Sequence, residues 1–228
     1  MAAAKATRKA GPRRAKRKFR AHGEESQERI LDAATEIAGE RGYDGTSVAL
    51  VSQRSGLPAS SIYWHFESKD QLIAAVIERS FHRWLERMHA WVPPREDASQ
   101  EELFEAAIRR TAAALTEAPD FLRLGLMLAL ERRPHEATAR RMFLQVRERA
   151  YKGMVASYEA FFAGALDAAD VRALATLTMA AADGLFIAHE VEPASVDLDD
   201  AFQLLAEALL GAAKALSARS DRSRREKR

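Results

Sequence analysis

The chain contains no cysteine among its 228 residues. This absence excludes a disulfide framework, a thiol nucleophile and a cysteine-based metal site. No uninterrupted run of 18 apolar residues occurs either, so the sequence predicts no membrane-spanning helix. The N-terminal stretch lacks the apolar core of a secretory signal. We therefore expect a cytoplasmic protein with no membrane partner.

Motifs for catalysis and metal binding are also missing. The six histidines show no HExxH spacing, and His189-Glu190 lacks the second histidine of such a motif. Neither a GxSxG nucleophile turn nor a phosphate-binding loop is present. We therefore expect no enzyme activity, no catalytic residues, no metal and no cofactor.

Positive charge is concentrated at the two ends of the chain. Residues 5–20 hold nine Lys and Arg and no acid, and residues 219–228 have a net charge of +4. Because the whole chain is only +2, the stretch 21–218 is acidic. Basic ends on an acidic body indicate an anionic partner. We predict a disordered basic arm over residues 1–22 and a basic tail over residues 219–228.

Apolar residues recur with helical spacing through the rest of the chain, and no stretch alternates as a strand does. The sequence therefore predicts an all-α fold of about nine helices. Two short helices fall within residues 46–69. The others are expected at about 25–41, 69–91, 99–116, 121–130, 136–162, 168–189 and 197–216.

The stretch Thr46 to Lys69 reads as a helix, a sharp corner and a second helix. Ser47 suits an N-cap, and Gly56 can adopt the positive φ that the corner requires. Ile62 and Phe66 are four residues apart and share a buried face. The outward residues of the second helix are Ala59, Ser60, Ser61, Tyr63, Trp64 and His65. Hydroxyls beside aromatic rings favour a DNA-facing surface, although Trp64 as a packed aromatic and His65 as a structural histidine remain alternatives.

The segment GLPASSIYWHFESKDQL resembles the recognition-helix signature of the TetR (tetracycline-repressor) family of transcription regulators. The matching positions are Gly56, Ile62, Tyr63, His65, Phe66, Lys69 and Leu72. The resemblance covers about residues 24–80. It implies a three-helix helix-turn-helix DNA-binding domain over residues 23–69, followed by a helical ligand-binding and dimerisation domain over residues 70–218.

By this resemblance, the second helix of the motif lies at the major groove, and Tyr63 and Lys69 approach phosphates. The expected DNA-binding residues are Ser47, Ala59, Ser60, Ser61, Tyr63, Trp64, His65 and Lys69. The sequence departs from the family pattern at Ala49, where an arginine that contacts the DNA backbone is common, at Pro58 and at Leu50. Residues 23–80 also hold ten acids and five bases. The basic arm, with Arg14, Arg17 and Lys18, is therefore expected to bind DNA as well, either along phosphates or in the minor groove.

The resemblance also implies a pocket for a small-molecule effector and a dimer interface. The expected ligand-binding residues are Trp84, Met88, Phe104, Phe121, Leu124, Met127, Phe143, Arg147 and Tyr151, although aromatic and methionine residues on helical faces are more often core. The expected dimer-interface residues are Leu174, Leu177, Ala181, Leu185, Phe202, Leu205 and Leu209, with packing inside one chain as the alternative.

Together these features predict a homodimeric regulator that binds double-stranded DNA at a palindromic operator. We expect a repressor that a hydrophobic small molecule releases. One alternative is an all-α small-molecule-binding or enzymatic domain with a vestigial helix-turn-helix. Another is a non-specific DNA binder driven by the basic ends.

Overall fold

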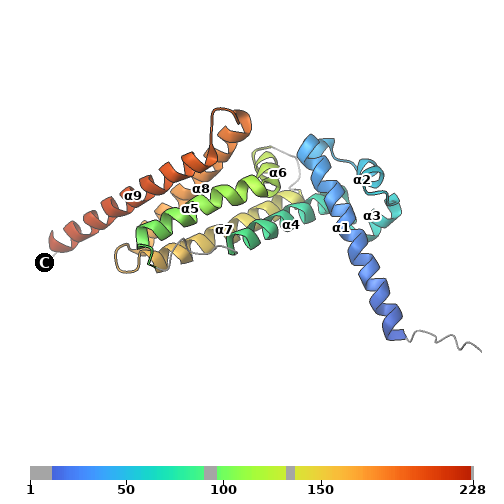
Figure 1. The fold of residues 1–228 in the computed structure, drawn as a ribbon, viewed down its shortest axis with the longest axis horizontal. Coiled ribbons are helices and arrows are strands. Elements are labelled where there is room, and N and C mark those ends of the chain that lie inside the picture. Colours follow the sequence, from blue (N-terminus) through green and yellow to red (C-terminus); the bar gives the residue numbers. More distant parts are fainter. Residues whose placement is uncertain (1–11, 90–96, 132–136, 227–228) are drawn as a thin grey trace, which may run out of the picture. The chain divides into compact units, whose positions relative to one another are not determined.

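The structure, a computed structural model, describes residues 12–89, 97–131 and 137–226 (Figure 1). These residues form helices and their connections, with no strand among them, which confirms the all-α prediction. The helices are α1 (Pro12–Gly45), α2 (Val48–Ser55), α3 (Ala59–His65), α4 (Lys69–His89), α5 (Gln100–Glu117), α6 (Asp120–Leu130), α7 (Thr138–Phe161), α8 (Ala168–Val191) and α9 (Leu198–Glu226).

The chain divides into two compact units, Met1–Val76 and Ile77–Arg228. The first unit contains α1, α2 and α3, and the second contains α5 to α9. The division falls inside α4, seven residues beyond the boundary that the sequence predicts between residues 69 and 70.

The first unit is a three-helix core in which α1, α2 and α3 all pack on one another. The predicted apolar face of α1 is fully inward, because Ile30, Ala34, Ile37 and Ala38 are each at most 2% exposed. Gly42 has a φ of 67°, so the regular part of α1 ends there, as the Arg41-Gly42 pair predicts.

The N-terminal part of α1 differs from the prediction. The sequence predicts disorder through residue 22, whereas α1 begins at Pro12 and continues into the core without a break before Gly42. Proline suits the first helical turn, and the alanine, arginine and lysine residues that follow it are good helix formers. High like charge therefore does not prevent helical backbone here. The C-terminal tail is likewise helical through Glu226.

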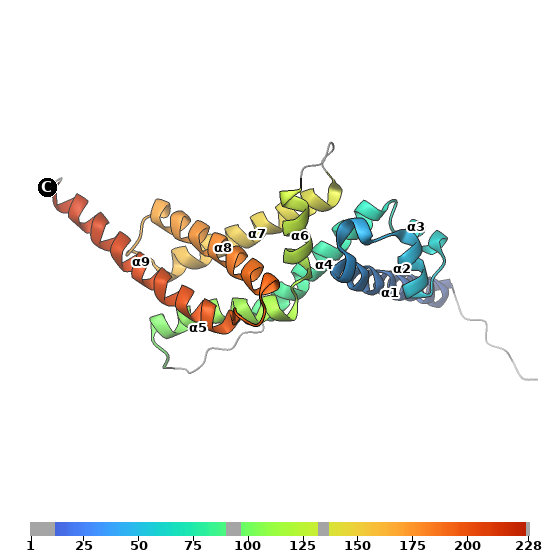
Figure 2. The ribbon, with the colours of Figure 1, turned by 90° about the horizontal axis from the view of Figure 1, so that it is seen from above.

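In the second unit, α9 packs along both α5 and α8, α8 packs on α7, and α7 packs on α6 (Figure 2). Phe81, Phe143, Phe186 and Phe202 lie fully inside. Gly125 is required where α6 meets α7, because a Cβ atom there would lie 1.9 Å from Cδ2 of Phe143. The absent side chain thus lets the phenyl ring pack directly on the α6 backbone.

The two C-terminal helices are apolar on two faces. Their inward faces are buried, whereas Leu177 is 50% and Leu204 67% exposed. On α8 the exposed face is Ala173, Leu177, Ala180, Gly184, Ile187 and Val191. On α9 it is Leu204, Ala208, Gly211, Ala215 and Ala218. These positions repeat every three or four residues, so each set forms one stripe along its helix. We call the two sets the α8 stripe and the α9 stripe.

This double apolar character bears on the expectation that the chain has no membrane-spanning helix. Ala168–Val191 and Leu198–Arg219 are long and apolar enough to cross a membrane by length and composition, although only 28% of each is buried. A search for uninterrupted apolar runs misses them because a few charged residues interrupt both helices. A helix that is apolar nearly all round also arises where one face packs inside its chain and another packs on a partner.

Candidate nucleic-acid interface

The corner between α2 and α3 is fixed by backbone geometry and by polar contacts. Gly56 caps α2 with a φ of 67°, and the hydroxyl of Ser47 caps its other end by accepting from the Leu50 amide at 3.2 Å. The Ser52 hydroxyl donates to the Leu57 carbonyl at 2.7 Å across the corner. The Arg29 side chain of α1 donates to the Ser55 carbonyl at 2.7 Å. The two helices are therefore held at a defined angle.

Helix α3 turns one face inward and the other outward, as the sequence predicts. Ile62 and Phe66 are 1% and 6% exposed, whereas Tyr63 and Trp64 are 55% and 69% exposed. Pro58 is the N-cap rather than the first helical residue, and it makes no side-chain cap. The structure therefore leaves two large aromatic rings at the surface of a short helix.

Trp64 is exposed but supported on two sides. Its ring stands edge-on to His65 with centroids 4.6 Å apart, and its far edge lies 3.9 Å from where a Cβ atom of Gly23 would sit on α1. A shallow groove of about 380 Å³ runs beside it, lined by Gly23, Ser26, Leu57, Ser60, Ser61, Trp64 and His65. Partial burial lowers the pKa of His65 below its usual value, so its ring is neutral near pH 7.

The contribution of α1 to this groove was not among the sequence predictions. Gly23 and Ser26 come from a different helix, about 35 residues before α3 in the chain. No local pattern in the sequence places them beside Trp64.

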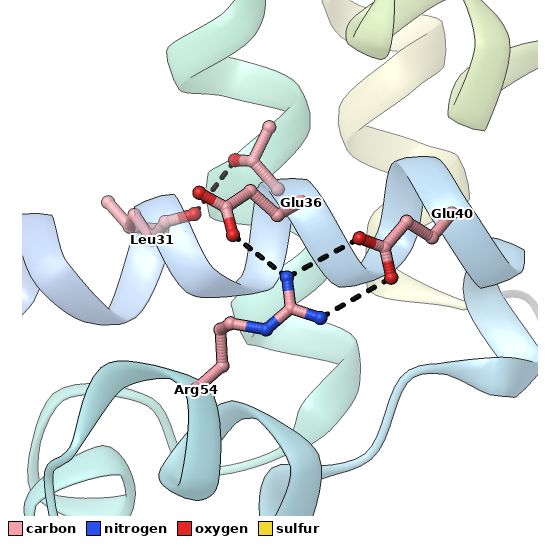
Figure 3. Close-up of polar contacts among 5 residues, drawn as sticks. Leu31, Glu36, Glu40 and Arg54 are labelled. Carbon is pink, nitrogen blue, oxygen red and sulfur yellow. Dashed lines mark hydrogen bonds and ion pairs between the residues drawn. The ribbon is translucent and has the colours of Figure 1, made fainter.

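Arg54 joins α2 to α1 by ion pairs. Its guanidinium lies between the carboxylates of Glu36 and Glu40, at 2.9 Å and 3.4 Å respectively (Figure 3). The hydrogen bonds that Arg54 donates to Glu36 and then to Glu40 raise the pKa of Arg54. A cation next to the helix-turn-helix is therefore already paired with two acids of the same unit.

Lys69 is also held inside the first unit. Its ammonium group donates to the Tyr43 carbonyl at 3.2 Å and lies 4.3 Å from the centroid of the Tyr43 ring. The Tyr43 hydroxyl in turn donates to Asp70 at 3.1 Å. Tyr43 thus packs on the domain. Lys69, for which the family resemblance implies a phosphate contact, makes these internal contacts in the structure.

These contacts leave residues 23–76 poor in available cations. Residues 23–76 hold four Lys and Arg against nine acids, and Arg29, Arg54 and Lys69 all make contacts within the unit. Arg14, Arg17 and Lys18 lie on the helical backbone of α1, but their side chains fall outside the described residues. A polyanionic partner would therefore draw most of its cations from residues 5–20.

The other predicted DNA-binding residues lie on the outward surface of α3 or next to it. Ser60 is exposed, and Ala59 and Ser61 are half-buried on α3. Ala49 is exposed on α2, so the family's usual arginine would have been accessible there. The structure thus brings Ser60, Ser61, Trp64 and His65 together in one groove, whereas the hydroxyl of Ser47 caps α2.

The predicted ligand-binding residues do not form one cluster. Trp84 and Phe121 pack with Phe81, with ring centroids 5.6 to 5.7 Å apart. Phe104 instead packs with Tyr158, Phe161 and Phe162. Of the remaining predicted residues, Leu124 and Phe143 are buried, Met88 and Tyr151 are half-buried, and Met127 is 51% exposed.

Arg147, a predicted polar anchor for a ligand, is part of a salt bridge. Its guanidinium makes two hydrogen bonds to Asp183 on α8, at 2.8 Å and 2.5 Å. Arg123 on α6 likewise donates two hydrogen bonds to the carboxylate of Glu190, from Nε at 2.6 Å and from Nη2 at 2.8 Å. These pairs join α7 and α6 to α8, so both arginines have structural partners.

Comparison with known proteins assigns the helix-turn-helix. Residues 30–76 match the family model described as bacterial regulatory proteins, tetR family. The chain is 32% identical over 66 residues to the HTH-type transcriptional regulator SrpR of Pseudomonas putida, covering 29% of this chain and 31% of SrpR. It is 31% identical over 64 residues to AcrR of Shigella flexneri, covering 28% and 30%. The match thus spans about a third of the length of these relatives.

Solved structures resemble the chain over most of its length. A transcriptional regulator from Rhodococcus sp. RHA1 aligns with a TM-score of 0.63 and 19% identity, over 82% of this chain and 97% of that one. FadR from Bacillus subtilis, in complex with stearoyl-CoA, aligns with a TM-score of 0.64 and 19% identity, over 81% and 97%. These likenesses establish the fold. The tetR-family match therefore covers the segment that contains the helix-turn-helix, and the likeness over most of the chain is one of fold.

Proposed function

We propose that this chain is a homodimeric repressor that binds a palindromic operator in the cytoplasm and is released by a hydrophobic small molecule. The observation that carries the DNA-binding part is the outward face of α3. It presents hydroxyls and two exposed aromatic rings on a helix that a glycine corner and nearby polar contacts hold in place. In a helix-turn-helix, the second helix of the pair lies in the major groove.

The α8 and α9 stripes support dimerisation. Of the seven predicted interface residues, Leu174, Phe202, Leu205 and Leu209 are buried inside the chain, Ala181 and Leu185 are half-buried, and Leu177 is exposed. The stripes therefore replace most of that set as the surface for a partner. Their small residues permit close helix approach, and a shallow apolar groove lined by Leu177 on α8 and Ala215 on α9 joins them. Helix-turn-helix regulators bind as dimers to two half-sites about 34 Å apart.

The cluster of Phe81, Trp84 and Phe121 supports an effector site. The Trp84 indole nitrogen is buried and has no hydrogen-bond partner among the residues that the structure describes. An apolar ligand with one acceptor group would satisfy that donor. The stearoyl-CoA complex of FadR from Bacillus subtilis shows that a protein of this fold holds an acyl ligand.

Helix α4 is the element through which we propose that an effector acts. It begins at Lys69, next to the helix-turn-helix, and carries Phe81 and Trp84 of the proposed effector site. A ligand that favours one position of α4 would change the affinity for DNA by the free energy of coupling, typically about 1–3 kcal/mol.

A gel-shift titration with DNA flanking the protein's own gene tests the proposed function. We expect a discrete complex at low salt that disappears when Ser60 and Tyr63 are replaced by alanine. An absence of any retarded complex at low salt would contradict the DNA-binding role.

The same variants separate the main alternative, a small-molecule-binding or enzymatic domain with a vestigial helix-turn-helix. That alternative is supported by the excess of acids in residues 23–76. That alternative predicts the same gel-shift result for the parent chain and for the variant with Ser60 and Tyr63 replaced by alanine, because it gives the α3 surface no role.

A further inference from the structure

The residues of α3 lack every side chain that reads a single base pair with two hydrogen bonds. The helix is Ala-Ser-Ser-Ile-Tyr-Trp-His, without arginine, lysine, asparagine or glutamine. Arginine and lysine are the usual readers of guanine, and asparagine and glutamine are the usual readers of adenine. In α2, Gln53 is the only amide, and Arg54 is paired with Glu36 and Glu40. The first helix of such a motif crosses the DNA backbone rather than entering the groove.

The polar groups that α3 does offer discriminate poorly between bases. A serine hydroxyl donates or accepts, so Ser60 and Ser61 can contact either member of a base pair. The neutral ring of His65 can likewise present a donor or an acceptor. These groups add affinity in the groove, but they do not by themselves define a sequence.

Trp64 provides the selective surface instead. Trp64 is 69% exposed, and its ring stands edge-on to His65 and lies beside Gly23 of α1, so its neighbours limit the orientations that it can adopt. A fixed aromatic ring presents a flat apolar surface with little conformational entropy to lose on binding. The matching apolar group on a base edge in the major groove is the C5-methyl group of thymine, which no other base carries.

We propose that the domain selects its operator chiefly through thymine methyl groups that pack on the Trp64 ring. The proposal rests on the proposed DNA-binding function and names the base chemistry that α3 reads. Tyr63, 55% exposed one residue before Trp64, offers a second ring on the outward side of α3. Operator half-sites then carry thymines at the positions that face Trp64. Ser60, Ser61 and His65 add hydrogen bonds to the neighbouring base pairs.

Replacing thymine by deoxyuridine tests this directly. The full chain is first used to select tight-binding duplexes from a randomised pool, and the selected duplex is resynthesised with one thymine at a time replaced by deoxyuridine. The substitution removes only the major-groove methyl group and leaves the minor-groove edge unchanged. We expect one or two positions per half-site to lose about fourfold in affinity each, the value of one buried methyl group.

Variants show which side chain contacts the methyl group. Trp64→Ala should bind the thymine duplex more weakly and no longer distinguish it from the deoxyuridine duplex. Trp64→Phe should retain part of the difference. Ser60→Ala is the matched control on the same helix face, and it should lower affinity while keeping the full thymine preference. Because these residues are exposed or half-exposed, circular dichroism should show that all three variants remain folded.

The possible results separate two kinds of failure. If the selection enriches no sequence, the proposed DNA-binding function itself fails. If a sequence is enriched but deoxyuridine costs nothing at any position, or costs the same in Trp64→Ala, then Trp64 does not read thymine and the inference is overturned.

Discussion

Two of the surfaces that expose apolar side chains, one on α3 and one on α8 and α9, have different surroundings. On α3, Tyr63 and Trp64 lie among the hydroxyls of Ser60 and Ser61. On α8 and α9, the two stripes consist only of aliphatic residues and glycine. A surface that mixes rings and hydroxyls suits a partner with polar edges, as a DNA groove has. A continuous stripe of small aliphatic residues suits another helix.

The two units also differ in where their charged side chains lie. In the first unit, Arg29, Arg54 and Lys69 make internal contacts, so most of the cations that could attract a polyanion lie in the basic segment, residues 5–20. The second unit directs its charged residues to the sides of α8 and α9 and leaves the stripes uncharged. Charge thus lies beside each proposed contact surface rather than in it.

The largest expected effect comes from placing a charge in the α9 stripe. Ala208→Arg would bury an unpaired charge between two copies, so we expect a monomer. Affinity for a palindromic duplex should fall by at least about 100-fold, because the two half-sites then bind independently. Sedimentation velocity and fluorescence anisotropy measure the two effects.

Ala156→Arg, at an exposed alanine of α7, is the matched control for that substitution. It should leave both the oligomeric state and the affinity unchanged. If Ala208→Arg remains dimeric, the stripe is not the interface, and the contrast between the two apolar surfaces fails.

A smaller effect is expected at the basic segment. Replacing Arg14, Arg17 and Lys18 by glutamine should reduce the log–log slope of affinity against salt by up to about 2.7, because each phosphate that is no longer neutralised removes about 0.9. Lys152→Gln, at an exposed lysine of α7, controls for the loss of one positive charge outside the basic segment and should leave the slope unchanged. An unchanged slope in the triple variant would show that the cations come from elsewhere.

Inward and outward positions of the second unit should also respond differently to an added methyl group. Gly125→Ala places a Cβ atom within the Phe143 ring and should lower the free energy of unfolding by about 1–3 kcal/mol. Gly153→Ala, also in a helix but with open space around it, should raise it by about 0.5–1 kcal/mol. Urea unfolding of both variants measures the contrast, and equal effects would mean that α6 and α7 are not in close contact.

The smallest predicted effect concerns alkaline pH. Burial raises the pKa of Tyr158 to about 12, with the hydrogen bond to Thr178 acting in the opposite direction. The unfolded chain loses this proton near pH 10, so the native state loses stability as pH rises from about 10 to 12. Tyr158→Phe should therefore lose less stability than the parent chain, by about 1 kcal/mol at pH 11. Identical pH profiles would place Tyr158 in contact with solvent.

The first unit was largely predictable because its signals are local. Ile62 and Phe66 lie one helical turn apart, and Gly42 and Gly56 occupy positions that need positive φ. The inward and outward faces of α3 follow from that spacing alone. The internal contacts of Lys69 were not predictable, because its partner Tyr43 lies 26 residues earlier in the chain.

The interface on α8 and α9 shows where pattern reading is insufficient. Each helix carries two apolar stripes, and periodicity alone does not say which one faces the core. Packing against α5 and α7 decides this, and it turns Phe202 and Leu209 inward and Leu204 outward. A search for a second apolar period on the same helix would have identified the exposed stripe.

The most direct test of the whole account compares the specificity of the full chain with that of a variant lacking residues 1–20. Affinity is measured for a selected duplex and for a scrambled duplex across a range of salt concentrations. If the basic segment supplies affinity and α3 supplies selectivity, deletion weakens binding to both duplexes in parallel, lowers both salt slopes and preserves their affinity ratio. A ratio that collapses to one on deletion, or that is already one for the full chain, would contradict the account.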